Sequence, residues 1–202
     1  MPYEIFKASL SSFLQEVEKS EAISRALYVA VECASGEVGI YTLLGGHLRG
    51  LLLESIPEAR LAINCCWPGL GIRPDFRVQL IRPSKQPIFA AEFKLVYEEG
   101  TANSMPEKVI ARAMDDIDRL KTIAIIRSEI RTAMVLFLRT RSSQIPERIL
   151  NALGTLKFEP VGSVLMWNPI STKEGNYFHI LLIPHDEVLR KGSAEEVDVV
   201  GA

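Results

Sequence analysis

The sequence predicts an α/β fold in which a mixed central sheet is flanked by helices. Stretches with apolar residues at the spacing of an amphipathic helix lie at the beginning, in the middle and towards the end of the chain. Short runs rich in β-branched and aromatic residues lie between them, bounded by proline, glycine or charged turns. The resulting order is helices, three strands, helix, strand, helix and two strands, which is typical of one sheet covered by helices.

Five segments are predicted to be helices. In the first, Phe6, Leu10 and Phe13 repeat at helical spacing, and the third shows the same pattern before it ends at Pro57. The fourth and fifth segments each begin at a proline, the residue favoured in the first helical position. The five segments are residues 5–17, 21–33, 38–55, 106–128 and 146–156.

Six runs are predicted to be strands. Three follow one another with only turns between them, as expected for a meander, and they span residues 61–67, 76–81 and 88–96. The run 133–138 is uninterruptedly apolar, which is expected in the interior of a sheet. The last two runs, residues 161–167 and 177–183, complete the fold.

The composition fits a single domain spanning residues 1–202. Hydrophobic residues make up 48% and charged residues 24% of the chain, the balance of a soluble globular protein. No apolar run approaches the roughly 20 residues that a membrane helix needs, and residues 1–10 lack the pattern of a secretory signal. The three cysteines, Cys33, Cys65 and Cys66, form no spaced disulfide framework, which favours a reducing, cytoplasmic location.

The charge is close to neutral and unevenly distributed. A formal net charge of -2 argues against a globally basic nucleic-acid-binding protein. Residues 186–202, expected to be a frayed acidic tail, hold five acidic and two basic residues. The remainder therefore carries a formal charge of +1, so the local distribution of charge matters more than the total.

Three polar residues on two neighbouring predicted strands point to chemistry. Asp75 begins a strand and shares a face with Arg77. Glu92 and Lys94 lie two residues apart on the next strand and share a face, separated by roughly 7 Å. That face also carries apolar residues, so it is expected to be buried, where charges must be paired or hold a metal ion. A turn-forming Pro-Asp and an exposed salt bridge are the simpler explanations of each residue taken alone.

A fourth acid, Glu54, lies near the end of the third predicted helix. It follows Leu51 by three residues and His47 by seven, which places it on the apolar side of that helix. An acid there needs a partner, unless it turns towards solvent at the helix end just before Pro57. Both interpretations stay open from the sequence.

The segment Pro74-Asp75, followed on the next strand by Glu92-Phe93-Lys94, resembles the motif of the PD-(D/E)XK nuclease superfamily. The surrounding elements resemble that family's restriction-endonuclease-like core, αβββαβ. The resemblance covers residues 38–140, about half of the chain, with N-terminal helices in residues 1–36 and an extra helix and two strands in residues 141–185. The motif is short and weak by itself, and its placement on successive strands of the right topology strengthens it.

The resemblance implies a metal-dependent endonuclease, a hydrolase of phosphodiester bonds. Asp75, Glu92 and the main-chain carbonyl of Phe93 would bind Mg²⁺, with Mn²⁺ as a substitute, because Mg²⁺ prefers oxygen ligands. Lys94 would orient or deprotonate the attacking water, or stabilise the pentavalent charge. Glu54 corresponds to an acid that joins the site in many members, where it would hold a second metal ion or a metal-bound water. The products would carry a 5′-phosphate and a 3′-hydroxyl.

Four basic residues are candidates for contacts with nucleic acid. Arg73 and Arg77 belong to the strand of Asp75, and Lys108 and Arg112 share one face of the following helix. A solubilising sheet edge and a solvated charged helix face are the alternative roles. The expected partner is DNA, in restriction, repair or a mobile element. One such site cuts one strand, so cutting a duplex would favour a symmetric homodimer.

Two other functions stay open. A catalytically inactive nuclease-like module, binding nucleic acid or a protein partner, is favoured by the near-neutral charge and disfavoured by the complete set of Asp75, Glu92 and Lys94. An unrelated α/β protein, in which these charges are structural, is the third alternative. It predicts no binding of Mn²⁺.

Overall fold

The computed structural model describes residues 2–32, 36–63, 74–80, 87–99, 105–167 and 176–190. Three helices come first, then three strands, and the order continues with a helix, a strand, a helix, two strands and a helix. In chain order they are α1 (Pro2–Lys19), α2 (Glu21–Glu32), α3 (Gly36–Ser55), β1 (Ala59–Ile63), β2 (Phe76–Leu80), β3 (Pro87–Tyr97), α4 (Pro106–Ile126), β4 (Arg131–Thr140), α5 (Glu147–Leu153), β5 (Glu159–Met166), β6 (Asn176–Ile183) and α6 (His185–Arg190).

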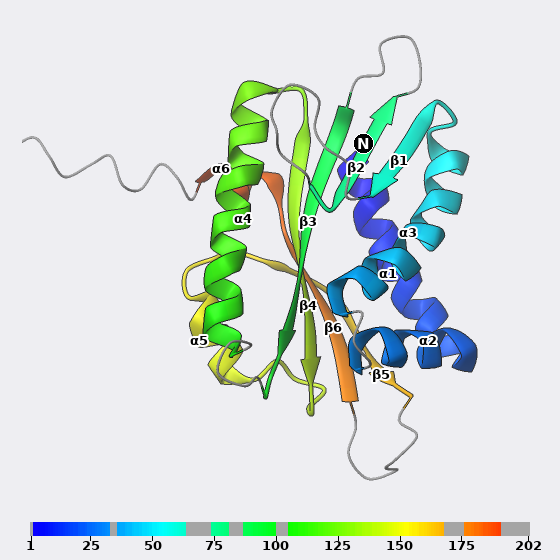
Figure 1. The fold of residues 1–202 in the computed structure, drawn as a ribbon, viewed down its shortest axis with the longest axis vertical. Helices are drawn as coiled ribbons and strands as arrows, with labels where there is room; N and C mark the ends of the chain where they lie inside the picture. Colours follow the sequence, from blue (N-terminus) through cyan, green and yellow to red (C-terminus); the bar gives the residue numbers. More distant parts are fainter. Residues whose placement is uncertain are drawn as a thin grey trace, which may run out of the picture.

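The six strands form one mixed sheet in the order β1-β2-β3-β4-β6-β5. β1, β2 and β3 pair antiparallel, so the predicted meander is confirmed. β3 and β4 are parallel and are connected through α4, whereas β6 runs antiparallel to both β4 and β5. β3 and β4 therefore occupy the middle of the sheet (Figure 1), as the uninterrupted apolar run of β4 predicts.

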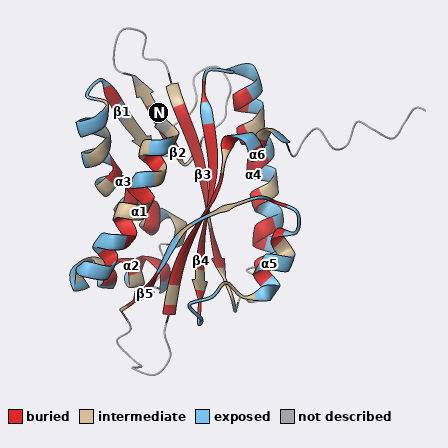
Figure 2. Cartoon of the chain, turned by 180° about the vertical axis from the view of Figure 1, so that it is seen from behind, coloured by how far each residue is buried: buried red, intermediate tan, exposed pale blue. Residues whose placement is uncertain are grey.

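Helices cover both faces of the sheet, as the sequence predicts. α1, α2 and α3 lie on one face, and α4, α5 and α6 lie on the other (Figure 1). Figure 2 shows buried residues along the strands and on the helix sides that face them. The core under α1–α3 contains a row of aromatic rings, Phe93, Phe137 and Phe178, with centroids 5.4 and 5.5 Å apart. The core under α4 is aliphatic and includes Ile110, Ile117 and Leu136.

The boundaries differ from the predicted ones by a few residues at most of the element ends. The strand predicted over residues 61–67 is β1, which begins at Ala59, and residues 64–67 lie outside the described part of the chain. Residues 185–190, most of which were assigned to the acidic tail, form α6. Hydrogen bonds stabilise this helix, because Glu187 accepts from Arg190 and from the backbone N–H of Lys157.

Among the described residues, no helix has the length and apolar character to span a membrane.

Candidate active site

The two halves of β3 have different neighbours. On one side β4 accompanies β3 from Phe89 to Tyr97. On the other side the ladder with β2 reaches only Ala91, which pairs with Phe76, the first residue of β2. Beyond Ala91 this side of β3 has no pairing with β2. Its backbone N–H groups there need other acceptors.

Two carboxylates accept those backbone protons. The N–H of Phe93 donates to Asp75 Oδ2 over 2.9 Å, and the N–H of Leu95 donates to Glu37 Oε1 over 3.0 Å. Asp75 directly precedes β2, and Glu37 stands in the first turn of α3. Elements from two different parts of the chain thus place acids side by side along the open edge of β3.

Glu92 projects beside Asp75. The Phe76–Ala91 pair, continued by one residue, sets Asp75 opposite Glu92, and their side chains are hydrogen-bonded. Glu92 is only 3% exposed. Burial raises the pKa of Glu92 to about 8, with further contributions from the charge of Asp75 and from the hydrogen bond between the two carboxyl groups. Glu92 therefore keeps its proton at neutral pH.

Lys94 lies on the same face of β3 as Glu92, as the sequence predicts. Its ammonium group is 2.6 Å from Asp116 Oδ2 and 3.8 Å from Glu37 Oε2, and it donates to the carbonyl of Phe93 over 3.3 Å. The Lys94 side chain is 18% exposed. A lysine so enclosed is held in one position, directly beside the pair of carboxyl groups.

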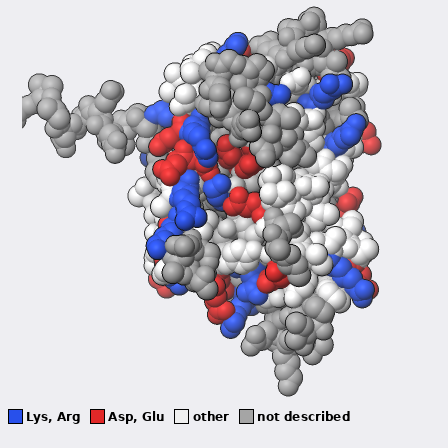
Figure 3. Space-filling model, viewed as in Figure 1, with Lys and Arg blue, Asp and Glu red and all other residues white. Residues whose placement is uncertain are grey.

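Asp116 joins this cluster from α4, which covers the face of the sheet opposite to α3 and Glu37. It lies in the middle of α4, is 2% exposed, and forms ion pairs with Lys94 and with Arg119, one turn further along the helix. Figure 3 shows acidic and basic side chains gathered together over α4 and the neighbouring part of the molecule. The described cluster consists of Glu37, Asp75, Glu92, Lys94, Asp116 and Arg119.

The structure does not bring Glu54 to this cluster. Glu54 is exposed near the end of α3, about 26 Å along the helix from Glu37. The acid that α3 contributes is Glu37, which sequence reasoning missed. A signal was present, because Glu37 precedes Ile40 by three residues, Tyr41 by four and Leu44 by seven, all of which are buried. Glu37 therefore occupies the inner side of α3.

Asp116 was also missed as a buried residue. It follows Ala113 by three residues and precedes Leu120 by four, both fully buried, so it lies on the apolar side, whereas Asp115 is exposed.

The four basic candidates have different surroundings. Arg73 lies outside the described residues. Arg77 is 7% exposed and is paired in the ladder with Ala62 and Ala90, so it is buried in the sheet and is not part of a surface patch. Lys108 and Arg112 are exposed on α4, on the turns that precede Asp116.

The oxygen atoms at the open edge of β3 fit a hard divalent cation. Among the described residues, no three acidic, histidine or cysteine side chains lie close enough to form a metal centre by themselves. The oxygen set here is two carboxyl groups, Asp75 and Glu92, together with the carbonyl of Phe93. Mg²⁺ is commonly held by one or two carboxylates and completes its shell with water and phosphate oxygens. A cation bound there would displace the proton that burial keeps on Glu92 at neutral pH.

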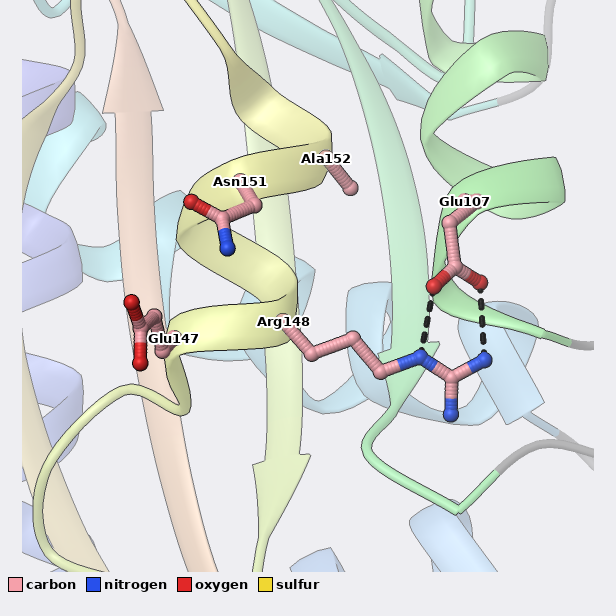
Figure 4. A pocket seen from close by; sticks show the side chains of 5 residues that line it. All are labelled: Glu107, Glu147, Arg148, Asn151 and Ala152. Carbon is pink, nitrogen blue, oxygen red and sulfur yellow. Dashed lines mark hydrogen bonds and ion pairs between the residues drawn. The ribbon is translucent and has the colours of Figure 1, made fainter.

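A surface hollow between α4 and α5 lies apart from this cluster. Its lining includes Glu107, Arg148 and Asn151, and Arg148 binds Glu107 with two hydrogen bonds of 2.5 and 3.0 Å (Figure 4). Glu107 is about 13 Å along α4 from Asp116. The two side chains satisfy each other, so this hollow carries no grouping of reactive residues comparable to the edge of β3.

Comparisons of the chain with models of known protein families, with curated proteins and with solved structures found no match.

Proposed function

We propose that this protein is a Mg²⁺-dependent nuclease that hydrolyses phosphodiester bonds in DNA, with the restriction-endonuclease-like core of the PD-(D/E)XK superfamily. The observation that carries the proposal is the contact between Asp75 and Glu92 where β2 and β3 separate, with Lys94 on the same face. The order α3-β1-β2-β3-α4-β4 supports it, because it corresponds to the αβββαβ core.

Asp75, Glu92 and the carbonyl of Phe93 are the groups that would hold the cation. Bound there, Mg²⁺ would lower the pKa of a water and neutralise charge on the phosphate. The hydrogen bond from Phe93 N–H keeps Asp75 in place for this role. Glu92 is kept in place by its burial against α4.

Lys94 is the residue that would act on the attacking water. It approaches the Phe93 carbonyl from the same side as the two carboxyl groups, so its ammonium lies within reach of a water or phosphate oxygen bound there. It would orient that water or stabilise the negative charge of the pentavalent phosphate. Asp116 and Glu37 hold the ammonium group from either side.

On α3, Glu37 rather than Glu54 belongs to the site. It receives the N–H of Leu95 and faces Lys94, so it fixes both the end of the open edge and the lysine. Glu54, at the opposite end of α3, provides a matched control on the same helix.

The deciding experiment is a nicking assay on supercoiled plasmid with Mg²⁺ or Mn²⁺. We expect the wild type to cut, and Asp75→Ala and Lys94→Ala to lose at least about a hundredfold in rate, since each removes a group that acts on the reacting atoms. Glu37→Gln should lose activity, whereas Glu54→Gln should cut like the wild type. A wild type that cuts nothing, or variants that all cut equally well, would refute the assignment.

A non-catalytic module that binds nucleic acid is the second candidate, favoured by the formal net charge of -2. Calorimetric titration with Mn²⁺, together with binding of labelled duplex DNA, separates the candidates. A nuclease should bind Mn²⁺ and lose that binding in Asp75→Ala. DNA binding without metal binding or cutting would favour the module, and the absence of all three would favour a structural role for these charges.

A further inference from the structure

Asp116 is an acid on the side of α4 that packs against the sheet. The neighbouring residues on that side are apolar, and they include Val109, Ala113, Ile117 and Leu120. A carboxylate at 2% exposure is unfavourable unless cations compensate it. Asp116 has two such cations, and its two oxygens are divided between them: Oδ2 contacts Lys94 and Oδ1 contacts Arg119.

The two cations differ in the exposed fraction of their side chains. The Lys94 side chain is 18% exposed and is enclosed by Asp116, Glu37 and the Phe93 carbonyl. The side chain of Arg119 is 55% exposed. A guanidinium group has five N–H donors in a planar fork, and one Asp116 oxygen occupies only part of them. Arg119 therefore presents donors to solvent while its position is held from inside the protein.

Arg119 also lies close to the pair of acids. Its partner Asp116 also contacts Lys94, which lies two residues from Glu92 on the same face of β3. The guanidinium group is thus joined to the cluster through Asp116, while more than half of its side chain is exposed. A phosphodiester approaching Asp75 and Glu92 from solvent would meet Arg119.

We propose that Arg119 binds a non-bridging phosphate oxygen of the DNA substrate beside the cutting site, and that Asp116 is the positioning residue that holds its guanidinium group there. This inference rests on the proposed nuclease function and names a substrate contact of that site. The chemistry is that of a guanidinium fork on a phosphate, in which two N–H groups donate to oxygen and the charges are opposite. Asp116 fixes the fork, so less side-chain freedom is lost when the phosphate binds.

The test is binding of a fluorescent DNA duplex in EDTA, where no cutting occurs, followed by steady-state cutting in Mg²⁺. Arg119→Ala should weaken binding by about tenfold and reduce the slope of log affinity against log salt concentration by about one, since one phosphate contact is lost. Arg119→Lys should retain part of the affinity. Arg148→Ala is the matched control, because Arg148 is equally tethered to an acid but lies away from the site (Figure 4). It should bind like the wild type.

Asp116→Asn tests the positioning role, because the amide keeps the shape of the side chain and removes its charge. We expect Asp116→Asn to raise Kd in EDTA in the same direction as Arg119→Ala, with little further loss of binding in the double variant, since both changes disable the Arg119 contact. Additive losses in the double variant would contradict a role of Asp116 through Arg119. Circular dichroism and thermal unfolding of each variant establish that it is folded.

The outcomes separate this inference from the proposed function. If the wild type cuts DNA and Arg119→Ala binds and cuts equally well, the contact is refuted and the nuclease function stands. If Arg119→Ala and Arg148→Ala weaken binding equally, the effect is general electrostatics, and the contact is refuted. A loss confined to kcat, with Kd and KM unchanged, also refutes it. If the wild type neither binds nor cuts DNA, both fail.

Discussion

Helix α4 contributes the acid of two acid–arginine pairs that have the same chemistry and differ in burial. Asp116 and Arg119 meet against the sheet, where the aspartate side chain is 3% exposed. Glu107 and Arg148 meet at the surface hollow between α4 and α5, where the two side chains are 46% and 47% exposed (Figure 4). The surface pair has two hydrogen bonds and regular geometry. Water nevertheless competes for both partners, so the pair is expected to stabilise the fold little.

In these two pairs we expect exposure, more than the number of contacts, to decide how strongly a substitution changes stability. The carboxylate of Asp116 is buried and cannot be solvated, so the loss of either partner leaves its charge uncompensated within the site. A third pair, Arg139 with Glu32 at 2.7 Å, joins β4 to α2 and has intermediate exposure, 17% and 24% for the two side chains. These pairs form a series from buried to exposed.

The largest effect is expected at the buried end of the series. Asp116→Ala removes the carboxylate that compensates Lys94 and Arg119 and should lower the free energy of unfolding by about 3–5 kcal/mol. Urea unfolding measures this change. Asp115→Ala, which alters the adjacent exposed acid of the same helix, should stay within about 0.5 kcal/mol of the wild type. Equal losses in the two variants would break the link between burial and stability.

Glu92 is a buried acid beside another acid, Asp75. Its substitution should therefore raise the free energy of unfolding, whereas that of Asp116 lowers it. Its pKa is raised from 4.5 to about 8, so the native state keeps a proton that the unfolded state has already released. Stability from this group is present below pH 4.5 and is lost as the pH rises towards 8. In EDTA, Glu92→Gln should therefore be more stable than the wild type at pH 8, by on the order of a few kcal/mol.

The difference between Glu92→Gln and the wild type should shrink as the pH falls towards 5. Unfolding curves at three pH values test this trend. A wild type whose stability rises steadily from pH 5 to pH 8 relative to the variant would contradict the raised pKa of Glu92.

The intermediate pair should have an intermediate effect. Glu32→Gln keeps the shape of the side chain and removes its charge opposite Arg139, so we expect a loss of about 0.5–1 kcal/mol in the free energy of unfolding. Because the pair is part-exposed, 1 M salt should reduce the difference between variant and wild type. A loss as large as that of Asp116→Ala would show that exposure does not order the series.

The smallest effect is expected at the surface hollow. Glu107→Gln and Arg148→Ala should leave the urea midpoint unchanged, because both charged groups are fully solvated when the pair is broken. A double-mutant cycle on these two residues measures their coupling directly. A clear destabilisation by either variant would mean that the hydrogen-bond geometry of an exposed pair matters more than its solvation.

The sequence predicts the α/β class and the positions of the strands because side-chain periodicity is a local property. The alternation in β2, the apolar run of β4 and the turns between the first three strands predict the meander and the central place of β4, which the pairing confirms. The same alternation predicts that Glu92 and Lys94 share a buried face, and Glu92 is indeed buried.

The choice among several acids of one helix depended on tertiary structure. The apolar side of α3 runs past both Glu37 and Glu54, and only the end of the β2 ladder at Ala91 decides which helix end meets the open edge of β3. Glu37 lies at that end of the helix, where it accepts the N–H of Leu95 and pairs with the ammonium group of Lys94.

By itself, then, the sequence determined the elements, the class of fold and the shared face of Glu92 and Lys94, because each follows from spacing along a single helix or strand. Tertiary structure alone decided that Asp75 contacts Glu92 and that Glu37 rather than Glu54 joins them. The physical reason is that these contacts join residues far apart in the chain. Their geometry is set by where a strand ladder stops and how a helix is rotated against the sheet.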